Sequence, residues 1–225
     1  HIDAAMAAKL HGVLADGKTH TVHVNSSGGD DLAALTLAED IRRTHAALVV
    51  DGLCAGPCAN DLFVAAAERS VMPGGLVIFA ASATSRLAMV PQARTKEVAP
   101  NYPQAAQQEK QLFATAHVDP ALLFEPQIKL ETSCWSLTSR NPAGQAYINY
   151  QSQFVGWIPS RAYLARAGLN VAGFWPANNA QFNNAIKNAF PGGARGAIAY
   201  SGTEKPSPPS ALLARLAAIK ECAKR

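Results

Sequence analysis

The alternation of helical and strand patterns over the first eighty residues constrains the fold more than any other feature of this sequence. Apolar residues recur at helical spacing over residues 3–14 and 32–44, and a third helix is expected over residues 58–68. The expected strands cover residues 21–25, 47–50, 69–71 and 76–80. Because strands joined by crossover helices pair most simply in a parallel sheet, the sequence predicts an α/β fold.

The regular alternation ends after Pro91. Beyond it, we expect helices over residues 102–116, 178–189 and 211–222, and strands within residues 121–137, 147–157 and 197–200. We therefore expect an α/β core over residues 1–125 and a mixed extension over residues 126–225 that packs against it.

Composition excludes several classes of protein. Apolar residues make up 48% of the chain and charged residues 16%, whereas a disordered chain has few apolar residues and a high net charge. No apolar run reaches the roughly 18–20 residues of a membrane-spanning helix, so we expect no transmembrane segment. The net charge is +4, and the basic residues are scattered apart from a loose group at Arg86, Arg94 and Lys96. A solvated surface is therefore favoured over a nucleic-acid site.

Three segments of the first half carry a family resemblance. Residues 24–30 (VNSSGGD) are similar to a strand-to-glycine loop, residues 52–59 (GLCAGPCA) to a turn that carries a nucleophile, and residues 73–80 (PGGLVIFA) to a strand that ends in a catalytic histidine. In this order and spacing they resemble the ClpP/crotonase superfamily, most closely the ClpP-like serine peptidases of bacterial envelopes. The resemblance implies a core of repeated β-β-α and βαβ units.

The side chains that serine-peptidase chemistry needs are absent at the matching positions. The sequence has Gly56 where the family places the serine and Ala80 where it places the histidine. Pro57 follows the nucleophile position and has no backbone N–H, so one oxyanion donor is also missing. Gly28 and Gly29 remain as an oxyanion-like loop. Since nucleophile, base and one donor are all lost, we expect no serine-peptidase activity.

The resemblance and these losses together predict a binding protein. We expect a catalytically inactive, ClpP-like pseudopeptidase of the bacterial envelope that binds another protein or an extended peptide segment, as a regulator, a scaffold or an immunity-type factor. A peptide can add to a sheet edge by main-chain hydrogen bonds alone, which needs no catalytic side chain. A homo-oligomer is a further alternative, because this superfamily often assembles into trimers or larger rings. No cofactor is expected.

An enzyme with relocated catalytic residues is the alternative. Ser82 or Ser85 could act as a nucleophile near the expected cleft, and Asp30 or Asp31 could supply crotonase-like acid–base chemistry, as could Asp61. For Asp30 or Asp31 a helix cap is the favoured interpretation.

A metal site is not expected. His20 and His23 could suggest a pair of ligands, but residues three apart on a strand point to opposite faces. A solvated or core histidine is therefore favoured at both positions.

The four cysteines are disulfide candidates. Cys54 and Cys58 are four residues apart, close enough for a bond if the turn between them bends the chain, and the resembling branch commonly has cysteine at both positions. Cys134 and Cys222 would then form the second pair; free buried thiols are the alternative. An even count without zinc-site or CxxC spacing favours an oxidising compartment such as a periplasm. The start at His1 rather than Met indicates that something upstream, such as an export signal, was removed or never included.

Overall fold

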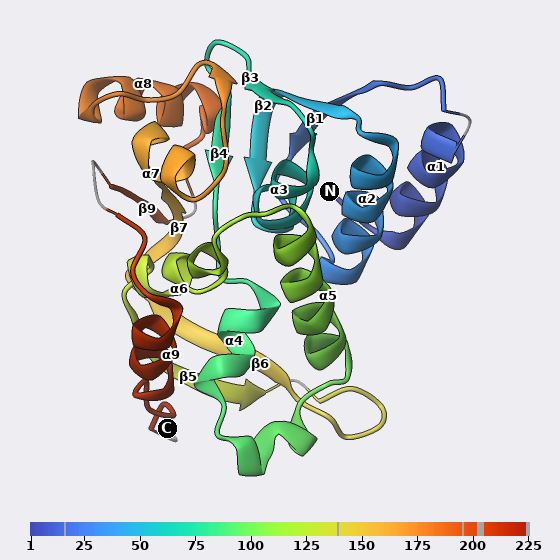
Figure 1. The fold of residues 1–225 in the computed structure, drawn as a ribbon. Coiled ribbons are helices and arrows are strands. Elements are labelled where there is room, and N and C mark those ends of the chain that lie inside the picture. The colour runs from blue at the N-terminus through green and yellow to red at the C-terminus, as the bar shows by residue number, and fades with distance from the viewer. Residues whose placement is uncertain (16, 139, 195, 202–204, 224–225) are drawn as a thin grey trace.

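A parallel sheet lies at the centre of a mixed α/β fold (Figure 1). The computed structural model describes residues 1–15, 17–138, 140–194, 196–201 and 205–223. The sheet comprises β1 (Thr21–Ser26), β2 (Ala47–Ala55), β3 (Arg69–Val71), β4 (Leu76–Ile78) and β8 (Ala172–Gly173). Strand β2 pairs with β1 on one side, with β3 along the first half of its other side, and with β4 along the second half. β8 extends the sheet beside β3, every pair is parallel, and the predicted α/β class is confirmed.

Strand β2 continues to Ala55, although the sequence predicted its end at Val50. Asp51 and Gly52 are typical of a turn, but the second half of β2 is held extended by its pairing with β4. The side-chain oxygen of Asn25 also accepts a hydrogen bond from the backbone N–H of Leu53 at 3.0 Å. Cross-strand contacts therefore outweigh the local preference for a turn.

Three long helices lie beside the sheet, and their bounds match the prediction to within a residue or so: α1 (Ala4–Ala15), α2 (Asp31–Thr44) and α5 (Asn101–Thr115). α1 packs on α2, and α2 packs on α5 (Figure 1). The carboxylate of Asp30 accepts a hydrogen bond from the Ala33 N–H at 2.9 Å and so begins α2, while His45 ends it in the left-handed conformation. Among the described residues, no helix is both long enough and apolar enough to cross a membrane.

The helix predicted over residues 58–68 is shorter and partly of another type. A π-helical turn covers Cys58–Leu62, and α3 covers only Phe63–Ala65. The Arg69 guanidinium donates hydrogen bonds to three carbonyl groups at the end of this segment, those of Phe63, Val64 and Ala66. Because these carbonyls bind a side chain from the next strand, the helix ends before the predicted residue.

Several short helices follow β4 that the periodicity did not predict: α4 (Ala83–Met89), α6 (Glu125–Lys129), α7 (Arg161–Arg166) and 3₁₀ turns over Gln92–Glu97 and Pro120–Leu123. Each has at most seven residues. Such segments contain too few turns for a periodic apolar pattern, and their caps and packing hold them.

The second half of the chain adds two small sheets and two further helices: β5 (Thr132–Thr138) with β6 (Tyr147–Ser152), β7 (Phe154–Ile158) with β9 (Ala197–Tyr200), α8 (Asn179–Ala189) and α9 (Pro209–Ala217). The strand predicted within 147–157 is two strands, β6 and β7. α9 ends at Ala217 rather than 222, because the following residues pair with β5: the Trp135 N–H donates to the Lys220 carbonyl and the Cys222 N–H to the Trp135 carbonyl.

The two halves meet where β4 ends. Phe79 and Trp157 exchange two backbone hydrogen bonds of 2.9 and 2.8 Å, so β7 continues the sheet antiparallel beyond β4. Both side chains are buried, and Phe63 and Tyr163 pack against them edge-on. One hydrophobic core therefore spans both halves.

Candidate functional site

The chain turns sharply after β2, and the residue at the turn is Gly56, which has no side chain. Gly56 adopts a φ of +55°, and its N–H donates to the Ile78 carbonyl at 3.0 Å. A Cβ atom at Gly56 would meet no atom within 4 Å, so this position faces open space. Pro57 follows with a φ of −55° and begins the π-helical turn. The left-handed backbone is one that glycine adopts readily.

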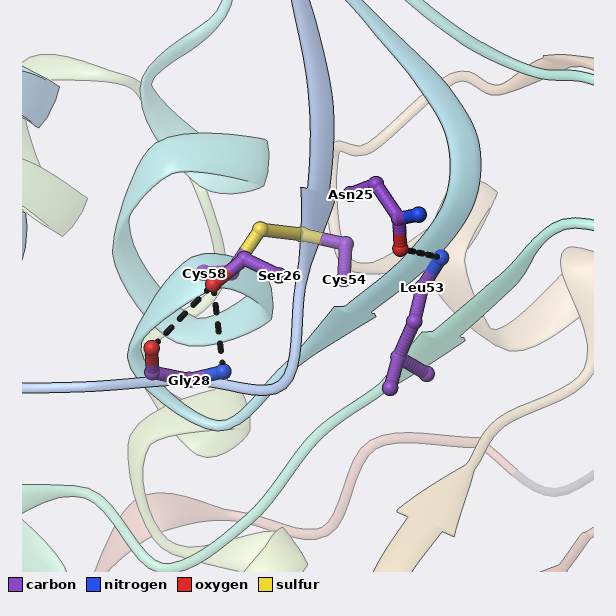
Figure 2. Close-up of a disulfide and its surroundings, with 6 residues drawn as sticks. All are labelled: Asn25, Ser26, Gly28, Leu53, Cys54 and Cys58. Atoms are coloured by element: carbon purple, nitrogen blue, oxygen red, sulfur yellow. Dashed lines mark hydrogen bonds between the residues drawn. A yellow bond between two sulfur atoms is a disulfide. The ribbon is translucent and has the colours of Figure 1, made fainter. Parts of the chain in front are cut away.

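A disulfide spans this turn. Cys54 and Cys58 are bonded, with their Cα atoms 5.2 Å apart, and both residues are fully buried (Figure 2). The second bond joins Cys134 to Cys222 across 88 residues. Both predicted pairs are confirmed. The first ties the end of β2 to the helical turn and holds the bend between them.

The glycine loop lies directly against the turn, and its own chain uses most of its polar groups. Gly28 approaches Ala55, because a Cβ at Gly28 would lie 3.2 Å from the Ala55 carbonyl oxygen. The Gly28 N–H donates to the Ser26 hydroxyl oxygen at 3.2 Å, and that hydroxyl donates to the Gly28 carbonyl at 3.1 Å (Figure 2). Ile2 pairs with the outer side of the loop, donating to the Gly28 carbonyl and accepting from the Asp30 N–H.

Asn60 links Gly56 to Ala80, and sequence reasoning missed it. Its backbone N–H donates to the Gly56 carbonyl at 2.8 Å. Its side-chain amide donates to the Ala80 carbonyl at 3.1 Å and accepts from the Ala80 N–H at 3.3 Å. Two adjacent polar residues, Asn60 and Asp61, in an otherwise apolar helical segment were the available signal, since a buried amide needs partners. Asn60 therefore links the turn at Gly56 to the end of the strand at Ala80 through their main-chain groups.

A cleft of about 530 Å³ lies beside this turn. The core contributes Ser27, Leu53, Ala55 and Ile78 to one wall, and the extension contributes Val155, Phe190, Gly193, Ala194 and Ile198 to the other. Of these residues, Ser27 alone has a hydroxyl group, and none is a histidine or a charged residue. The extension thus forms the second wall of the cleft and leaves it open.

A larger hollow of about 670 Å³ lies elsewhere, between the end of α2, the α3–β3 connection and the segment before β8. Arg69, the most buried basic residue that lines it, already donates hydrogen bonds to backbone carbonyls. The cleft at the turn is therefore the better candidate site, because it adjoins the matched segments.

Ser82 and Ser85 are buried away from the cleft. The Ser82 hydroxyl donates to the Leu123 carbonyl at 2.9 Å and accepts from the Ser85 N–H, which caps α4. The Ser85 hydroxyl donates back to the Ser82 carbonyl at 3.0 Å. Both hydroxyls thus stabilise the start of α4.

The candidate carboxylates also have structural contacts. Asp30 caps α2, and Asp31 forms an ion pair with Arg86. Asp61 is buried, and neither of its carboxylate oxygens has a hydrogen-bond partner among the described residues. Burial, and then repulsion by Glu109 and Asp31, raises the pKa of Asp61 well above its ordinary value, so this group is neutral at pH values where an exposed aspartate is charged.

Glu109 lies in the same buried region. Its two carboxylate oxygens each accept a backbone N–H of the first turn of α4, from Ala83 and Thr84, at 2.8 Å. Burial raises the pKa of Glu109, and these hydrogen bonds oppose the rise. The carboxyl group of α5 therefore holds α4 in place from a neighbouring helix.

The histidines considered as metal ligands do not meet at a site. His23 pairs with Asp51 at 3.0 Å on the exposed surface, and His20 is exposed just before β1. In the part of the chain that the structure describes, no cluster of three or more histidine, cysteine or acidic side chains could hold a metal ion.

Comparison with known proteins adds no family assignment. No protein-family model matches the sequence, and no curated protein matches it. The ClpP/crotonase relationship therefore stays a prediction that rests on the three matched segments and their spacing.

Proposed function

We propose that this chain is a catalytically inactive, ClpP-like pseudopeptidase that binds another protein through the cleft beside the Gly56 turn. One observation carries the proposal: a sharp turn lies beside a 530 Å³ cleft, and the described residues that line it include no histidine and no charged side chain. Such a cleft can hold a polypeptide by shape and main-chain hydrogen bonds, but nothing lining it can activate a nucleophile.

Three local features support binding without hydrolysis. Gly56 has no hydroxyl group, Ala80 has no titratable side chain, and Pro57 has no N–H to stabilise an oxyanion. The N–H of Gly28 is already bonded to Ser26, so this donor is also engaged. The remaining groups supply contact surface rather than chemistry.

The two disulfides favour an oxidising compartment, and within the proposal this is the bacterial periplasm or another exported location. There the chain would act as a regulator, a scaffold or an immunity-type factor for its partner. It needs no cofactor for this role, and self-association into a homo-oligomer is compatible with it.

The test combines partner capture with a variant in the cleft. Tagged chain is purified from its native envelope fraction after cross-linking, in parallel with Ala194→Arg on the extension wall and Ala4→Arg on exposed α1. We expect one stoichiometric protein partner with the native chain and Ala4→Arg, and loss of that partner with Ala194→Arg. Capture by all three proteins, or by none, would overturn binding through the cleft.

Fluorophosphonate labelling tests the alternative of a hydrolase with relocated residues. The hydroxyls of Ser82 and Ser85 are buried and bonded to backbone carbonyls, so we expect no label on either serine. Stoichiometric labelling of either one, lost on its replacement by alanine, would favour the relocated enzyme.

Restoring the catalytic groups tests whether the scaffold is that of a serine peptidase. In the triple variant Gly56→Ser, Pro57→Ala, Ala80→His, the new serine Cβ has open space around it. Peptidase activity in this variant, absent from the native chain, would support the family relationship. Its absence in a folded variant would count against that relationship and leave the binding role untouched.

A further inference from the structure

The outer edge of β6 has main-chain groups without a hydrogen-bond partner among the described residues. In an antiparallel pair, residues alternate between those whose N–H and C=O groups bond the partner strand and those whose groups point away. Tyr150 lies opposite Trp135, and Trp135 uses its own N–H and C=O on its far side, with Lys220 and Cys222. Tyr150 and Trp135 thus form a non-hydrogen-bonded pair, and the N–H and C=O of Tyr150 point to the outer edge of β6.

Other exposed strand edges nearby are already occupied. Two residues earlier, the Ile148 N–H and C=O both bond the Tyr102 hydroxyl, at 3.3 and 3.4 Å. Beside the Gly56 turn, Trp157 occupies the edge next to Phe79, and Ile2 occupies the outer side of the glycine loop. Tyr150 is different, because its main chain has no hydrogen bond on this edge among the described residues.

A groove of about 660 Å³ runs along this edge and shares one lining residue with the cleft. Five consecutive residues of β6, Ile148 to Ser152, line it together with Arg86, Tyr102 and Val155. Val155 also lines the cleft, and its side chain is 53% exposed, so the two hollows share this apolar side chain.

The charge along the groove is balanced. Among the described residues that line the groove and the cleft, Arg86 alone is charged, and its guanidinium pairs with Asp31 and also bonds the Ser82 carbonyl. An extra charge placed here would lose solvation without gaining an unpaired partner. An uncharged segment is therefore the complement of this surface.

We propose that an extended, uncharged segment of a partner protein adds to the outer edge of β6, exchanges two main-chain hydrogen bonds with Tyr150, and packs an apolar side chain against Val155 in the cleft. This inference rests on the proposed binding function and names the mode of binding. Tyr102 ends the added strand at one side, so the bound segment is short and continues toward the Gly56 turn.

To test this mode of binding, peptides that bind the immobilised chain are selected from a library of random decapeptides displayed on messenger RNA. We expect selected peptides to have uncharged residues with apolar side chains at alternate positions. Val155→Arg should raise the Kd of a selected peptide by about tenfold or more, while the control Val13→Arg, at another exposed valine on α1, should leave it unchanged. Methylation of the one peptide nitrogen that donates to the Tyr150 carbonyl should abolish binding. Methylation of the neighbouring peptide nitrogens should have little effect.

Amide hydrogen exchange by NMR supplies a readout specific to the edge. A bound peptide should slow exchange of the Tyr150 amide, whereas the Asn149 amide, which faces β5, should change little. Peptides that bind Val155→Arg with native affinity, or that leave the Tyr150 amide unprotected, would overturn the mode of binding. Failure to select any peptide would also count against it. In each case a partner lost on Ala194→Arg in the capture experiment would still support the proposed function.

Discussion

The two walls of the cleft are built in different ways. The core wall consists of strand ends in a parallel sheet and is held by a disulfide between residues four apart. The extension wall consists of β7, β9 and the segment after α8. The disulfide of this half joins Cys134 of β5 to Cys222 after α9, across 88 residues. The core wall therefore depends on local chain geometry, and the extension wall depends on contacts between distant segments.

Removal of each disulfide tests the difference between the two walls and has the largest expected effect. Cross-linking restricts the unfolded chain more when the loop is longer, so Cys134→Ala with Cys222→Ala should lower the free energy of unfolding by about 4–5 kcal/mol. The bond between Cys54 and Cys58 closes a much shorter loop, so Cys54→Ala with Cys58→Ala should lower the free energy of unfolding by about 2 kcal/mol. Urea denaturation of both variants measures the difference; equal losses would contradict the distinction between local and long-range restraint.

Two glycine substitutions test how closely the core wall is packed. In Gly29→Ala the new Cβ would lie 2.0 Å from the Ile2 carbonyl oxygen, so the pairing of Ile2 must break, and we expect a loss of about 3 kcal/mol. In Gly56→Ala the Cβ meets open space, and the left-handed backbone alone should cost about 1 kcal/mol. Thermal unfolding compares the two. A larger loss at Gly56 would show that the turn is packed rather than open.

The buried carboxyl group of Asp61 makes the core sensitive to pH. Its pKa in the folded protein is raised, so the folded state binds the proton more tightly than the unfolded state does. The contribution of Asp61 to stability is therefore greatest below the ordinary aspartate pKa and is lost as pH rises through the raised value. Facing groups also matter: Asp31 and Glu109 favour the neutral form of Asp61, and Arg86 opposes it.

Asp61→Asn should remove this dependence, since an amide stays neutral at every pH. At neutral and alkaline pH we expect the variant to equal or exceed the native chain, by up to about 2 kcal/mol, and at acid pH the two should converge. Unfolding temperatures from pH 4 to 9 measure both slopes. Parallel slopes would contradict a raised pKa at Asp61.

Matched helix caps give the smallest effects and test whether the two regions unfold together. Asp30 caps α2 in the core, and Asn178 caps α8 in the extension by accepting the Gln181 N–H at 3.0 Å. Each alanine substitution should cost about 1 kcal/mol. Because one hydrophobic core spans both regions, each should shift a single unfolding transition in calorimetry. Two separate transitions would show that the extension unfolds independently.

Patterns with a local physical cause were predicted well from the sequence. The periodic helices α1, α2 and α5, a cap at Asp30 or Asp31, the parallel strands of the first half and the Cys54–Cys58 bond were predicted from local patterns, and the Cys134–Cys222 bond followed as the remaining pair. Predictions were wrong where distant groups act on the chain. Pairing with β4 lengthens β2, Arg69 shortens the helix after Cys58, and pairing with β5 ends α9 early.

For the candidate site, too, local features could be predicted from the sequence and contacts between distant segments could not. The amino-acid sequence alone shows that positions 56, 57 and 80 carry no hydroxyl group, no backbone N–H at Pro57 and no imidazole, because the identity of a side chain needs no coordinates. Only the folded structure shows that Asn60 links Gly56 to Ala80, that Val155 and Ile198 form a second wall, and that the Tyr150 main chain has no partner on the outer edge among the described residues. These features depend on which residues meet across long stretches of chain, and the folding of the whole core sets those meetings.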